Sequence, residues 1–418
     1  MRVWLVCAGE MLPIDKGNQR TMRAGMLAQA LRARQHEVAW WTSAFDHSSK
    51  HLRCDHTTTM PLADGTRLKL LHARPYQQNV CLGRLVNHRQ LGREFRRESK
   101  QERAPELIFC CWPTIELGYA CVEYGKRHNI PVVLDVRDLW PDIFVDVIPS
   151  SIRGLARALA LPYFRMTQQA FRRCTAVVGI SERYLNWGLE YAGRCRKQFD
   201  GVFPLGYAEP LFSKASVDSE RQALQALGVD ESRTVCWFLG SFAQTYDLEP
   251  IIHAARQLQR AGTSQFQFVL SGDGEKRQAW ESLARGLDNV VFTGWLDGAK
   301  IAAMMQLSRV GIAAYRKGAP QGMPNKIFEY LAAGLPILSC LGGECEEFLR
   351  SADCGAQYLA GDPQSFLAGL LTLTSSVSRH AQVAANCARV FRSRYSAANV
   401  YPALVSHLEC LVTGQAVS

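Results

Sequence analysis

A lysine and a glutamate stand three residues apart at the start of a short predicted helix. The stretch Pro324-Asn-Lys-Ile-Phe-Glu-Tyr-Leu-Ala-Ala-Gly-Leu-Pro carries Lys326 and Glu329, with Asn325 as a favourable N-cap and Gly334 before a proline as a stop signal. The N-terminal end of a helix attracts phosphate, and a lysine there adds a full charge. A carboxylate one turn further can accept hydrogen bonds from two sugar hydroxyls. The spacing predicts either a nucleotide clamp or a surface Lys–Glu pair.

A second polar cluster follows a strand predicted at Val132–Asp135. The sequence continues Val-Arg-Asp-Leu-Trp-Pro-Asp, which places Arg137 and Asp138 directly after the strand. Open α/β sheets bind ligands at the carboxyl ends of their strands. Arg137 and Asp138 therefore either point toward a ligand, beside a reacting group, or form a structural salt bridge with each other.

Glycines and one tryptophan follow four further strands. Gly17 lies in the loop after the first strand of the chain, and Gly240 with Ser241 opens the loop after the first strand of the second half. Gly272 and Trp295 follow the next two strands. Glycine lets a ligand approach backbone N–H groups. The first loop lacks the GxGxxG pattern of dinucleotide-binding proteins, which argues against a dehydrogenase.

Strands and helices alternate through both halves of the chain, a rhythm that predicts parallel sheets with right-handed crossovers. The predicted strands are Val3–Cys7, Val38–Thr42, Leu68–His72, Leu107–Cys111, Val132–Asp135, Ala176–Ile180, Thr234–Leu239, Phe266–Leu270, Val290–Phe292, Gly311–Ala314 and Pro336–Cys340. Pro204, Gly206 and Pro210 interrupt the rhythm and mark a linker. We expect an α/β chain of two doubly wound, Rossmann-like domains, 1–205 and 206–394, that face each other across a cleft. We expect a helix from about Tyr395 that packs back on either domain, with the first domain as one of the two alternatives.

Composition is that of a globular protein, and 418 residues with 47% apolar and 21% charged residues suit two domains. No run approaches the roughly 18 apolar residues of a membrane span, and the start resembles a strand rather than a signal peptide. The 14 cysteines are scattered without a CxxC pair, which favours reduced thiols in a cytoplasm. Proximity of His47, His51, Cys54 and His56 suggests a metal, but a second ligand pair is missing, and we expect none.

A net charge of +10 calls for an anionic partner. Arginines gather on two predicted helices, in each case either a solvated face or a binding surface: Arg84, Arg89, Arg93, Arg96 and Arg97, then Arg153, Arg157, Arg165, Arg172 and Arg173. The second set is interleaved with apolar residues, a pattern typical of helices that rest on anionic lipid. Nucleic acid would use the same charge, but no nucleic-acid motif is present, so we predict a membrane surface and no nucleic acid.

In their order along the chain, these motifs resemble the retaining glycosyltransferases of family 4, which have the two-domain GT-B fold. The stretch 324–336 and the Arg-Asp-Leu-Trp-Pro at 137–141 are most similar to bacterial transferases of O-antigen and capsule synthesis, of the N-acetylfucosamine transferase type. The resemblance implies a UDP- or GDP-sugar donor in the second domain, with Glu329 on the ribose and Lys326 facing the diphosphate. It implies that Gly17 closes over the phosphates, and that Arg137 and Asp138 lie beside the donor sugar.

The sequence departs from the family pattern at three positions. Gln321 stands where the family has a second glutamate, and Ser241 and Tyr246 stand where an arginine and a lysine follow the first strand of the second domain. Lys326 is our candidate to replace the lost phosphate-binding charge. With Asp138 and Arg137 as the other catalytic candidates, and Gly240, Ser241, Gly272, Trp295 and Asn325 as donor contacts, we expect neither cofactor nor metal.

The implied acceptor is a glycan on polyprenyl diphosphate, at the inner face of the cell membrane, where the protein would be cytoplasmic and peripheral. Two other classes remain open. A sugar-nucleotide 2-epimerase has the same architecture and would act without an acceptor, and a basic nucleic-acid-binding protein would show steep salt dependence.

Overall fold

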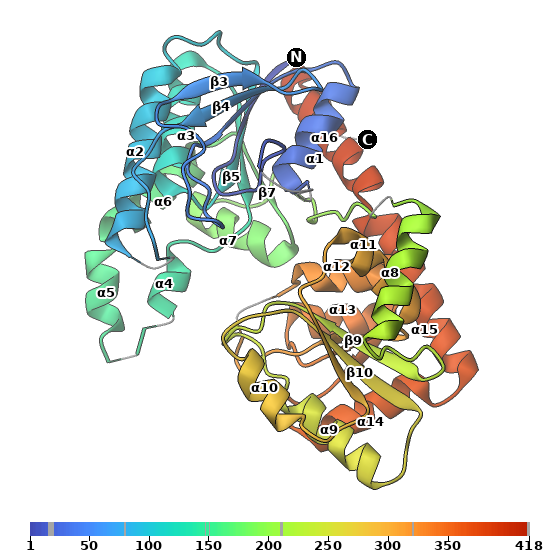
Figure 1. Ribbon diagram of the computed structural model, residues 1–418. Helices are drawn as coiled ribbons and strands as arrows, with labels where there is room; N and C mark the ends of the chain where they lie inside the picture. The colour runs from blue at the N-terminus through green and yellow to red at the C-terminus, as the bar shows by residue number, and fades with distance from the viewer. Residues whose placement is uncertain are drawn as a thin grey trace. The chain divides into compact units, whose positions relative to one another are not determined.

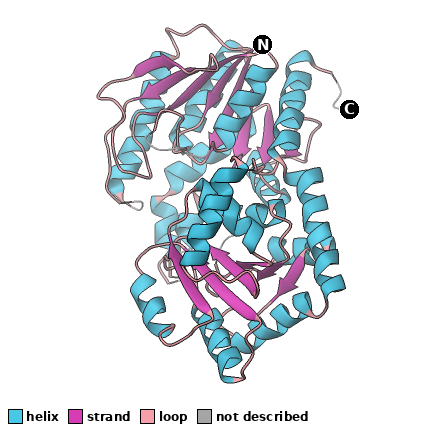
Figure 2. Cartoon of the chain, turned by 45° about the vertical axis from the view of Figure 1, so that its right-hand side comes forward, coloured by secondary structure: helices cyan, strands magenta, loops and turns pink. Residues whose placement is uncertain are grey.

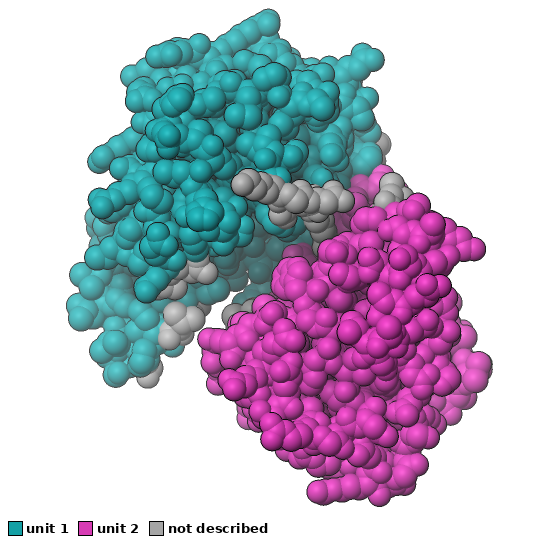
Figure 3. All heavy atoms as spheres, viewed as in Figure 1, with its two compact units in different colours: residues 1–205, 400–418 teal, residues 206–399 magenta. Residues whose placement is uncertain are grey.

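A computed structural model describes residues 1–15, 21–78, 81–146, 148–149, 151–209, 212–319 and 322–415. The chain divides into two compact units, which Figure 3 colours separately. Unit 1 holds Met1–Leu205 and the residues from Val400 onward, and unit 2 holds Gly206–Asn399. Gly17, Pro210 and Gln321 lie outside the described residues, so the predictions made for them stay predictions.

Unit 1 is built on an eight-stranded sheet with the order β3-β4-β2-β1-β5-β6-β7-β8. Its strands are β1 Arg2–Val6, β2 Glu37–Ser43, β3 Thr58–Pro61, β4 Arg67–Leu71, β5 Leu107–Trp112, β6 Val132–Val136, β7 Ala176–Gly179 and β8 Gly201–Val202. All neighbouring pairs are parallel except β3 with β4. The central strand β1 pairs with β2 on one side and β5 on the other, so the strand order reverses between β1 and β5.

Helices cover both faces of this sheet (Figures 1 and 2). They are α1 Arg23–Ala33, α2 Leu82–Glu98, α3 Ile115–His128, α4 Asp142–Asp146, α5 Arg153–Leu159, α6 Leu161–Arg173 and α7 Glu182–Ala192. Helix α2 packs on α3, and α3 on α6. Beneath α2, the rings of Trp4, Trp41 and Phe95 meet edge-on in the buried core. Parallel strands buried on both faces need such continuous apolar runs.

The last helix, α16 Ala397–Thr413, packs on unit 1 from Val400 onward. The Arg34 Nη1 and Glu409 Oε2 atoms lie 2.6 Å apart, which ties α16 to the end of α1. The Tyr401 hydroxyl donates to the Leu205 carbonyl oxygen at 2.8 Å. Before α16 comes a short π-helical turn at Phe391–Tyr395, so the helix begins slightly later than the sequence predicts.

Unit 2 repeats the architecture on a six-stranded, wholly parallel sheet in the order β11-β10-β9-β12-β13-β14. The strands are β9 Thr234–Leu239, β10 Phe266–Ser271, β11 Val290–Gly294, β12 Val310–Ala313, β13 Ile337–Ser339 and β14 Gly355–Gln357. Numbered from the first strand of the unit, this is the order 3-2-1-4-5-6 of dinucleotide-binding domains. The strand order reverses between β9 and β12, and that switch point is where such sheets bind ligands.

The helices of unit 2 are α8 Lys214–Ala226, α9 Glu249–Arg260, α10 Arg277–Leu283, α11 Gly298–Leu307, α12 Asn325–Ala332, α13 Glu344–Ala352, α14 Pro363–Thr374 and α15 Val377–Val390. Helix α9 packs on α14, and α8 packs on α11. The prediction of an α/β chain with two doubly wound sheets is confirmed. The short strands β3, β8 and β14 were not predicted.

Candidate active site

Helix α12 is fastened at the switch point of unit 2 by Tyr330. Its hydroxyl accepts a hydrogen bond from the Leu239 N–H and donates one to the Ile312 carbonyl oxygen, both at 3.0 Å. These two groups belong to the ends of β9 and β12, the strands that flank the switch point. A Cβ on Gly311 would lie 2.4 Å from the Tyr330 ring, so the ring needs a glycine beneath it. The first turns of α12 are thereby held over the carboxyl ends of both strands.

Lys326, in the first turn of α12, lies in a cage of three aromatic rings. Its Nζ atom is 3.9 Å from the ring centre of Tyr246, 4.3 Å from that of Phe238 and 5.0 Å from that of Tyr315. The side chain is only 5% exposed, and Nζ has no hydrogen-bond partner among the described residues. Buried polar groups normally find a partner, so this ammonium is a candidate to bind a ligand.

Burial lowers the pKa of Lys326 to about 7, and the nearby Glu329 carboxylate acts in the opposite direction. The three ring faces also favour the charged form. Glu329, one turn along α12, is itself buried, so the alternative of a surface Lys–Glu pair is wrong. Asn325 was predicted as N-cap, but Pro324 occupies that position in an extended conformation and Asn325 is the first residue of the helix.

Lys326 lies beside the loop after β9, where Ser241 and Tyr246 depart from the family pattern. Tyr246 occupies the place of the expected lysine, and the Lys326 ammonium lies directly over its ring. A Cβ on Gly240 would come within 2.8 Å of Nζ, so the ammonium also adjoins the start of the loop after β9. Positive charge is therefore present beside this loop although it comes from α12. Ser241, next in the loop, is exposed.

Gly272, after β10, crosses close to the loop after β9. Its φ is +153°, and a Cβ there would lie 1.8 Å from the Gly240 carbonyl oxygen, so only glycine fits. The Gly272 N–H donates to the Gly294 carbonyl oxygen at 2.9 Å, which links the ends of β10 and β11. Trp295 follows β11 with 71% of its surface exposed. Three of the predicted donor-binding loops thus share one edge of the sheet.

Unit 1 has a cavity of about 290 Å³ at the carboxyl edge of its own sheet, and both Arg137 and Asp138 line it. Of the two alternatives for this pair, the Arg137–Asp138 salt bridge is wrong, since Arg137 pairs with Glu10 instead. The Arg137 Nη1 atom lies 2.5 Å from the Glu10 Oε1 atom, and it donates to the Cys7 Sγ atom at 3.2 Å. The other Glu10 oxygen accepts from the Ala24 N–H at the start of α1. Arg137 leaves β6 toward the loop after β1, where its charge is balanced.

The Asp138 carboxylate has different partners from the Arg137 guanidinium. Its carboxylate accepts hydrogen bonds from the Leu139 N–H at 2.8 Å and from the Trp140 Nε1–H at 3.0 Å. Burial raises the pKa of Asp138, while these two donors act against the shift. Successive residues leaving a strand point to opposite sides, which separates Asp138 from Arg137.

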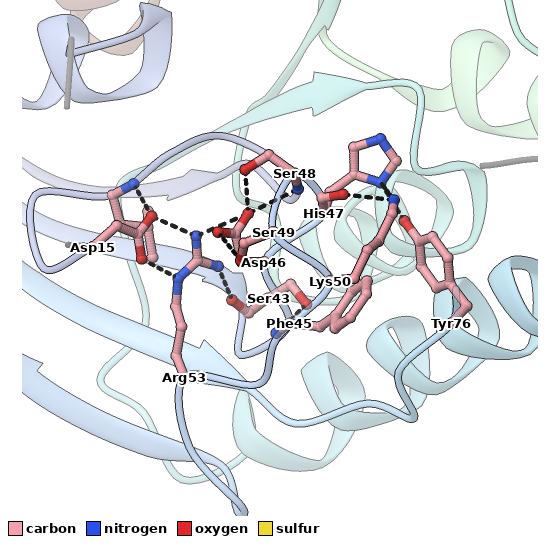
Figure 4. A network of polar contacts seen from close by, with 11 residues as sticks. Asp15, Ser43, Phe45, Asp46, His47, Ser48, Ser49, Lys50, Arg53 and Tyr76 are labelled. Carbon is pink, nitrogen blue, oxygen red and sulfur yellow. Dashed lines mark hydrogen bonds and ion pairs between the residues drawn. The ribbon is translucent and has the colours of Figure 1, made fainter. Parts of the chain in front are cut away.

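The loop after β2 brings His47 to the same cavity, and a network of polar contacts holds the loop (Figure 4). The Arg53 guanidinium binds both oxygens of Asp15 at 2.6 Å and donates to the Ser43 carbonyl oxygen. Asp46 accepts from the residues that follow it, and the His47 Nδ1 atom lies 2.6 Å from the Tyr76 hydroxyl oxygen. The network fixes both ends of the loop.

The histidines of this cavity are neutral at neutral pH. Burial lowers the pKa of His47 to about 4, and burial lowers that of His88 to about 3. The cationic groups that line the cavity are therefore arginines, Arg137 and Arg84. His47, His51, Cys54 and His56 do not form a metal centre: among the described residues no group of three or more histidines, cysteines and carboxylates is placed to hold a metal ion.

Several of these residues escaped the sequence-based prediction. Glu10 follows β1 and Tyr315 follows β12, so each could have been found from its place after a central strand. Arg84 was predicted only as part of a basic helix face, and His88, four residues later on the same face of α2, was not predicted. The ring cage around Lys326 had no local signal, because its members come from three separate segments.

Comparisons with known proteins agree with this geometry. Residues 233–376, which include all of the Lys326 site, match the family model described as "Glycosyl transferases group 1". A search of curated proteins with this sequence finds no match.

Solved structures resemble the chain over its whole length. Sucrose-phosphate synthase from Thermosynechococcus elongatus is 14% identical with a TM-score of 0.71, covering 99% of this chain and 100% of that one. HepE of Anabaena in complex with UDP is 16% identical with a TM-score of 0.67, covering 98% and 100%. WaaG, a glycosyltransferase involved in lipopolysaccharide biosynthesis, is 14% identical with a TM-score of 0.64, covering 99% and 100%. At such low identity these structures show the fold, which is GT-B. With the family match over residues 233–376, the protein is a glycosyltransferase of GT-B fold.

Proposed function

We propose that the protein transfers a sugar, with retention of anomeric configuration, from a nucleoside diphosphate sugar to a glycan carried on polyprenyl diphosphate. The proposal includes membership of family 4 and a place in bacterial surface polysaccharide synthesis, of the N-acetylfucosamine transferase type. One observation carries it. The Lys326 ammonium, buried and without a hydrogen-bond partner among the described residues, lies at the switch point of a nucleotide-binding type of sheet.

The donor is a UDP- or GDP-sugar in this proposal. HepE was solved with UDP and with UDP-glucose, which supports a nucleotide donor for a chain of the same fold. Lys326 and the N–H groups at the start of α12, beginning at Asn325, would hold the diphosphate. Glu329 would accept hydrogen bonds from the ribose hydroxyls. Trp295, exposed at the same edge, would stack on the base.

Two glycines shape the donor site in this proposal. Their N–H groups are bonded to the Ser271 and Gly294 carbonyl oxygens, so the contribution of Gly240 and Gly272 is the close crossing of their loops, which leaves no side chain between them. Ser241 would add a hydroxyl. Gly17, beyond the described residues, keeps its predicted role of closing over the phosphates. No metal is required because the lysine and the helix supply the positive charge.

Transfer with retention proceeds by attack on the face from which the diphosphate leaves. The departing phosphate oxygen takes the proton of the acceptor hydroxyl, so no protein nucleophile is needed. What the protein supplies is alignment and stabilisation of the charge that grows on the leaving group. Lys326 carries the largest share of that stabilisation, and Arg137 and Asp138 of unit 1 are proposed to position the reacting sugar.

A lipid-linked acceptor is supported by the surface of unit 1. Ile152, Leu155, Leu159 and Leu161 are all more than 40% exposed around α5, and arginines alternate with them. Such a basic, apolar surface suits an anionic bilayer. No helix in the described part of the chain has the length and apolar character needed to cross a membrane. The proposal places the protein peripherally on the cytoplasmic face, and flotation with anionic liposomes at low salt tests it.

A thermal-shift screen of nucleotides tests the donor. UDP or GDP at a hundredfold excess over its Kd should stabilise the protein by about 2.7 kcal/mol. Stabilisation by neither would overturn the proposal. Incubation of the matching nucleotide sugar without acceptor gives the second arm, since a 2-epimerase would convert it and a transferase would leave the sugar configuration unchanged.

A further inference from the structure

Unit 1 contains a second, larger cavity beside the one that Arg137 and Asp138 line. Its volume is about 500 Å³, within the range of pockets that enclose small ligands. It lies among α2, the start of α3, the loop after β6 and the helices α4, α5 and α6. Its walls are mostly apolar, with Leu85, Ile115, Phe144 and Leu159 among them. Nothing in the proposed donor site uses it.

The mouth of this cavity is rimmed by exposed apolar side chains. Leu82, at the start of α2, is 79% exposed, and Leu159, at the end of α5, is 75% exposed, yet both line the cavity. Helix α5 buries none of its residues. Figure 1 shows α4 and α5 at the edge of unit 1, near the N-terminal end of α2. Contiguous exposed apolar surface of this kind marks a binding site rather than a free surface.

A single wall joins the apolar cavity to the polar one. Arg84 and His88 line both, and Trp140 lines the apolar one. The Arg84 guanidinium lies 4.3 Å from the Trp140 ring centre, and the His88 ring stacks on Trp140 with centres 5.6 Å apart. His88 is neutral, so Arg84 supplies the charge of this wall. A guanidinium between a polar pocket and an apolar one suits an anion that joins a polar group to a hydrocarbon.

The apolar cavity has one acidic lining residue, Glu116, in the first turn of α3. Its carboxyl is 6% exposed, and its Oε1 atom has no hydrogen-bond partner among the described residues. Burial raises the pKa of Glu116 to about 7. The carboxyl is therefore largely protonated in slightly acidic solution, where it is compatible with an apolar occupant.

We infer that this cavity binds the isoprenoid chain of a polyprenyl diphosphate acceptor, with the diphosphate on Arg84 and the glycan in the polar cavity. The inference rests on the proposed function, which it extends by naming the site of the lipid. Three features select this occupant: the apolar walls, the arginine that lines both cavities, and the position of the two cavities on either side of Arg84 and His88. Arg89 and Arg157, each placed over an aromatic ring nearby, add charge that suits an anionic lipid surface around the mouth.

Binding of farnesyl diphosphate, followed by tryptophan fluorescence, is the test because Trp140 lines the apolar cavity. Wild-type protein should bind it at least about tenfold more tightly than inorganic pyrophosphate, the gain expected from burying a few methylene groups. The tryptophan of Ala156→Trp fills the cavity from α5. It should weaken the binding of farnesyl diphosphate about tenfold or more, because the isoprenoid chain can then bury fewer methylene groups. Ala158→Trp is the matched control, on the same helix but outside the lining, and should bind like wild type.

Arg84→Gln is a second test variant. It should bind farnesyl diphosphate more weakly than wild type, although its apolar cavity is intact. Equal affinity for pyrophosphate and farnesyl diphosphate, or unchanged binding in Ala156→Trp, overturns the inference. So does a dimer of the wild-type protein that Ala156→Trp dissociates, since a second copy would then fill the cavity. Each variant is also tested for its thermal shift with UDP and GDP. A nucleotide response without isoprenoid binding refutes only this inference, whereas isoprenoid binding without a nucleotide response refutes the proposed donor.

Discussion

Each unit has a cation at the carboxyl edge of its sheet, Arg137 in unit 1 and Lys326 in unit 2. The surroundings of the two cations differ. In unit 1, Arg137 is paired with Glu10 at 2.5 Å. In unit 2, the Lys326 ammonium is enclosed by aromatic rings and has no hydrogen-bond partner among the described residues. A balanced cation is part of the architecture. A buried cation without such a partner is costly to the folded protein, and the proposed diphosphate would supply that partner.

This difference separates the roles of the two edges. Glu10 both pairs with Arg137 and accepts from the Ala24 N–H at the start of α1, so it joins the loop after β1, helix α1 and the end of β6. Nearby, Arg23 and Asp135 form a fully buried pair at 2.8 Å. The edge of unit 1 is therefore pre-organised by internal ion pairs, whereas in our proposal the edge of unit 2 receives the anionic donor.

Replacing the unbalanced cation should have the largest effect on activity. Lys326→Met removes the charge that faces the leaving group, and we expect turnover to fall about 10²–10³-fold, the usual loss for one transition-state donor. The matched control is Lys300→Met, since Lys300 lies on α11 with an exposed partner, Asp297. Steady-state kinetics with the donor found in the nucleotide screen measures both. Turnover of Lys326→Met at the wild-type level would contradict the role of Lys326.

Replacing the balanced cation should reduce stability, in addition to any loss of sugar positioning. Arg137→Met leaves the Glu10 carboxylate buried without its partner, which should destabilise the protein by about 3–5 kcal/mol. The double variant with Glu10→Gln should recover part of this loss. As control, Arg96→Met breaks an exposed pair with Glu123 and should change stability by less than about 1 kcal/mol. Denaturant unfolding measures all four proteins, and equal effects of the two arginine substitutions would remove the contrast.

Donor binding should depend on pH through Lys326. Its pKa of about 7 in the free protein must rise when a diphosphate binds, because the anion favours the charged form. The donor affinity should therefore fall above pH 7, by up to about tenfold per pH unit. In Lys326→Met the same titration should be flat between pH 7 and 9. A pH dependence shared by both proteins would assign the titration to another group.

The smallest effect concerns the stability of the free protein. Folding lowers the pKa of Lys326 below its value in the unfolded chain, so the lysine destabilises the fold at pH 7 and below, and stability recovers as pH rises toward 10. Lys326→Met should melt about 2–4 °C higher near pH 6.5, the shift that 1 kcal/mol produces in a domain of this size. The advantage should shrink at pH 9. If Lys326→Met melts at a lower temperature than wild type, the aromatic rings offset the whole cost of burying the ammonium, and the expected destabilisation by Lys326 is absent.

Much of the scaffold was predictable because its strands are continuous apolar runs. Thr234–Leu239, for example, has the predicted bounds. The short edge strands were missed since two to four residues carry too little pattern. The site was predictable where one helix holds it, as with Lys326 and Glu329.

Contacts that join distant segments were beyond the sequence. Glu10, as the partner of Arg137, was not predicted, and neighbouring Asp138 was taken as its alternative partner. The cage of Phe238, Tyr246 and Tyr315 likewise depends on how β9 and β12 bring their loops together. The cavity below α5 depends on how α2, α5 and α6 pack, which helical periodicity alone does not fix.

We propose that the Lys326 ammonium binds the donor diphosphate, and calorimetry of UDP or GDP binding is the sharpest test of this role. Titrations near pH 7.5 in two buffers of different ionisation enthalpy give both the affinity and the number of protons taken up. Wild-type protein should take up a fraction of one proton per nucleotide bound. Lys326→Met should take up none, and it should bind at least about tenfold more weakly because a charge-assisted contact is lost. Equal affinity and equal proton uptake in the two proteins would contradict the account.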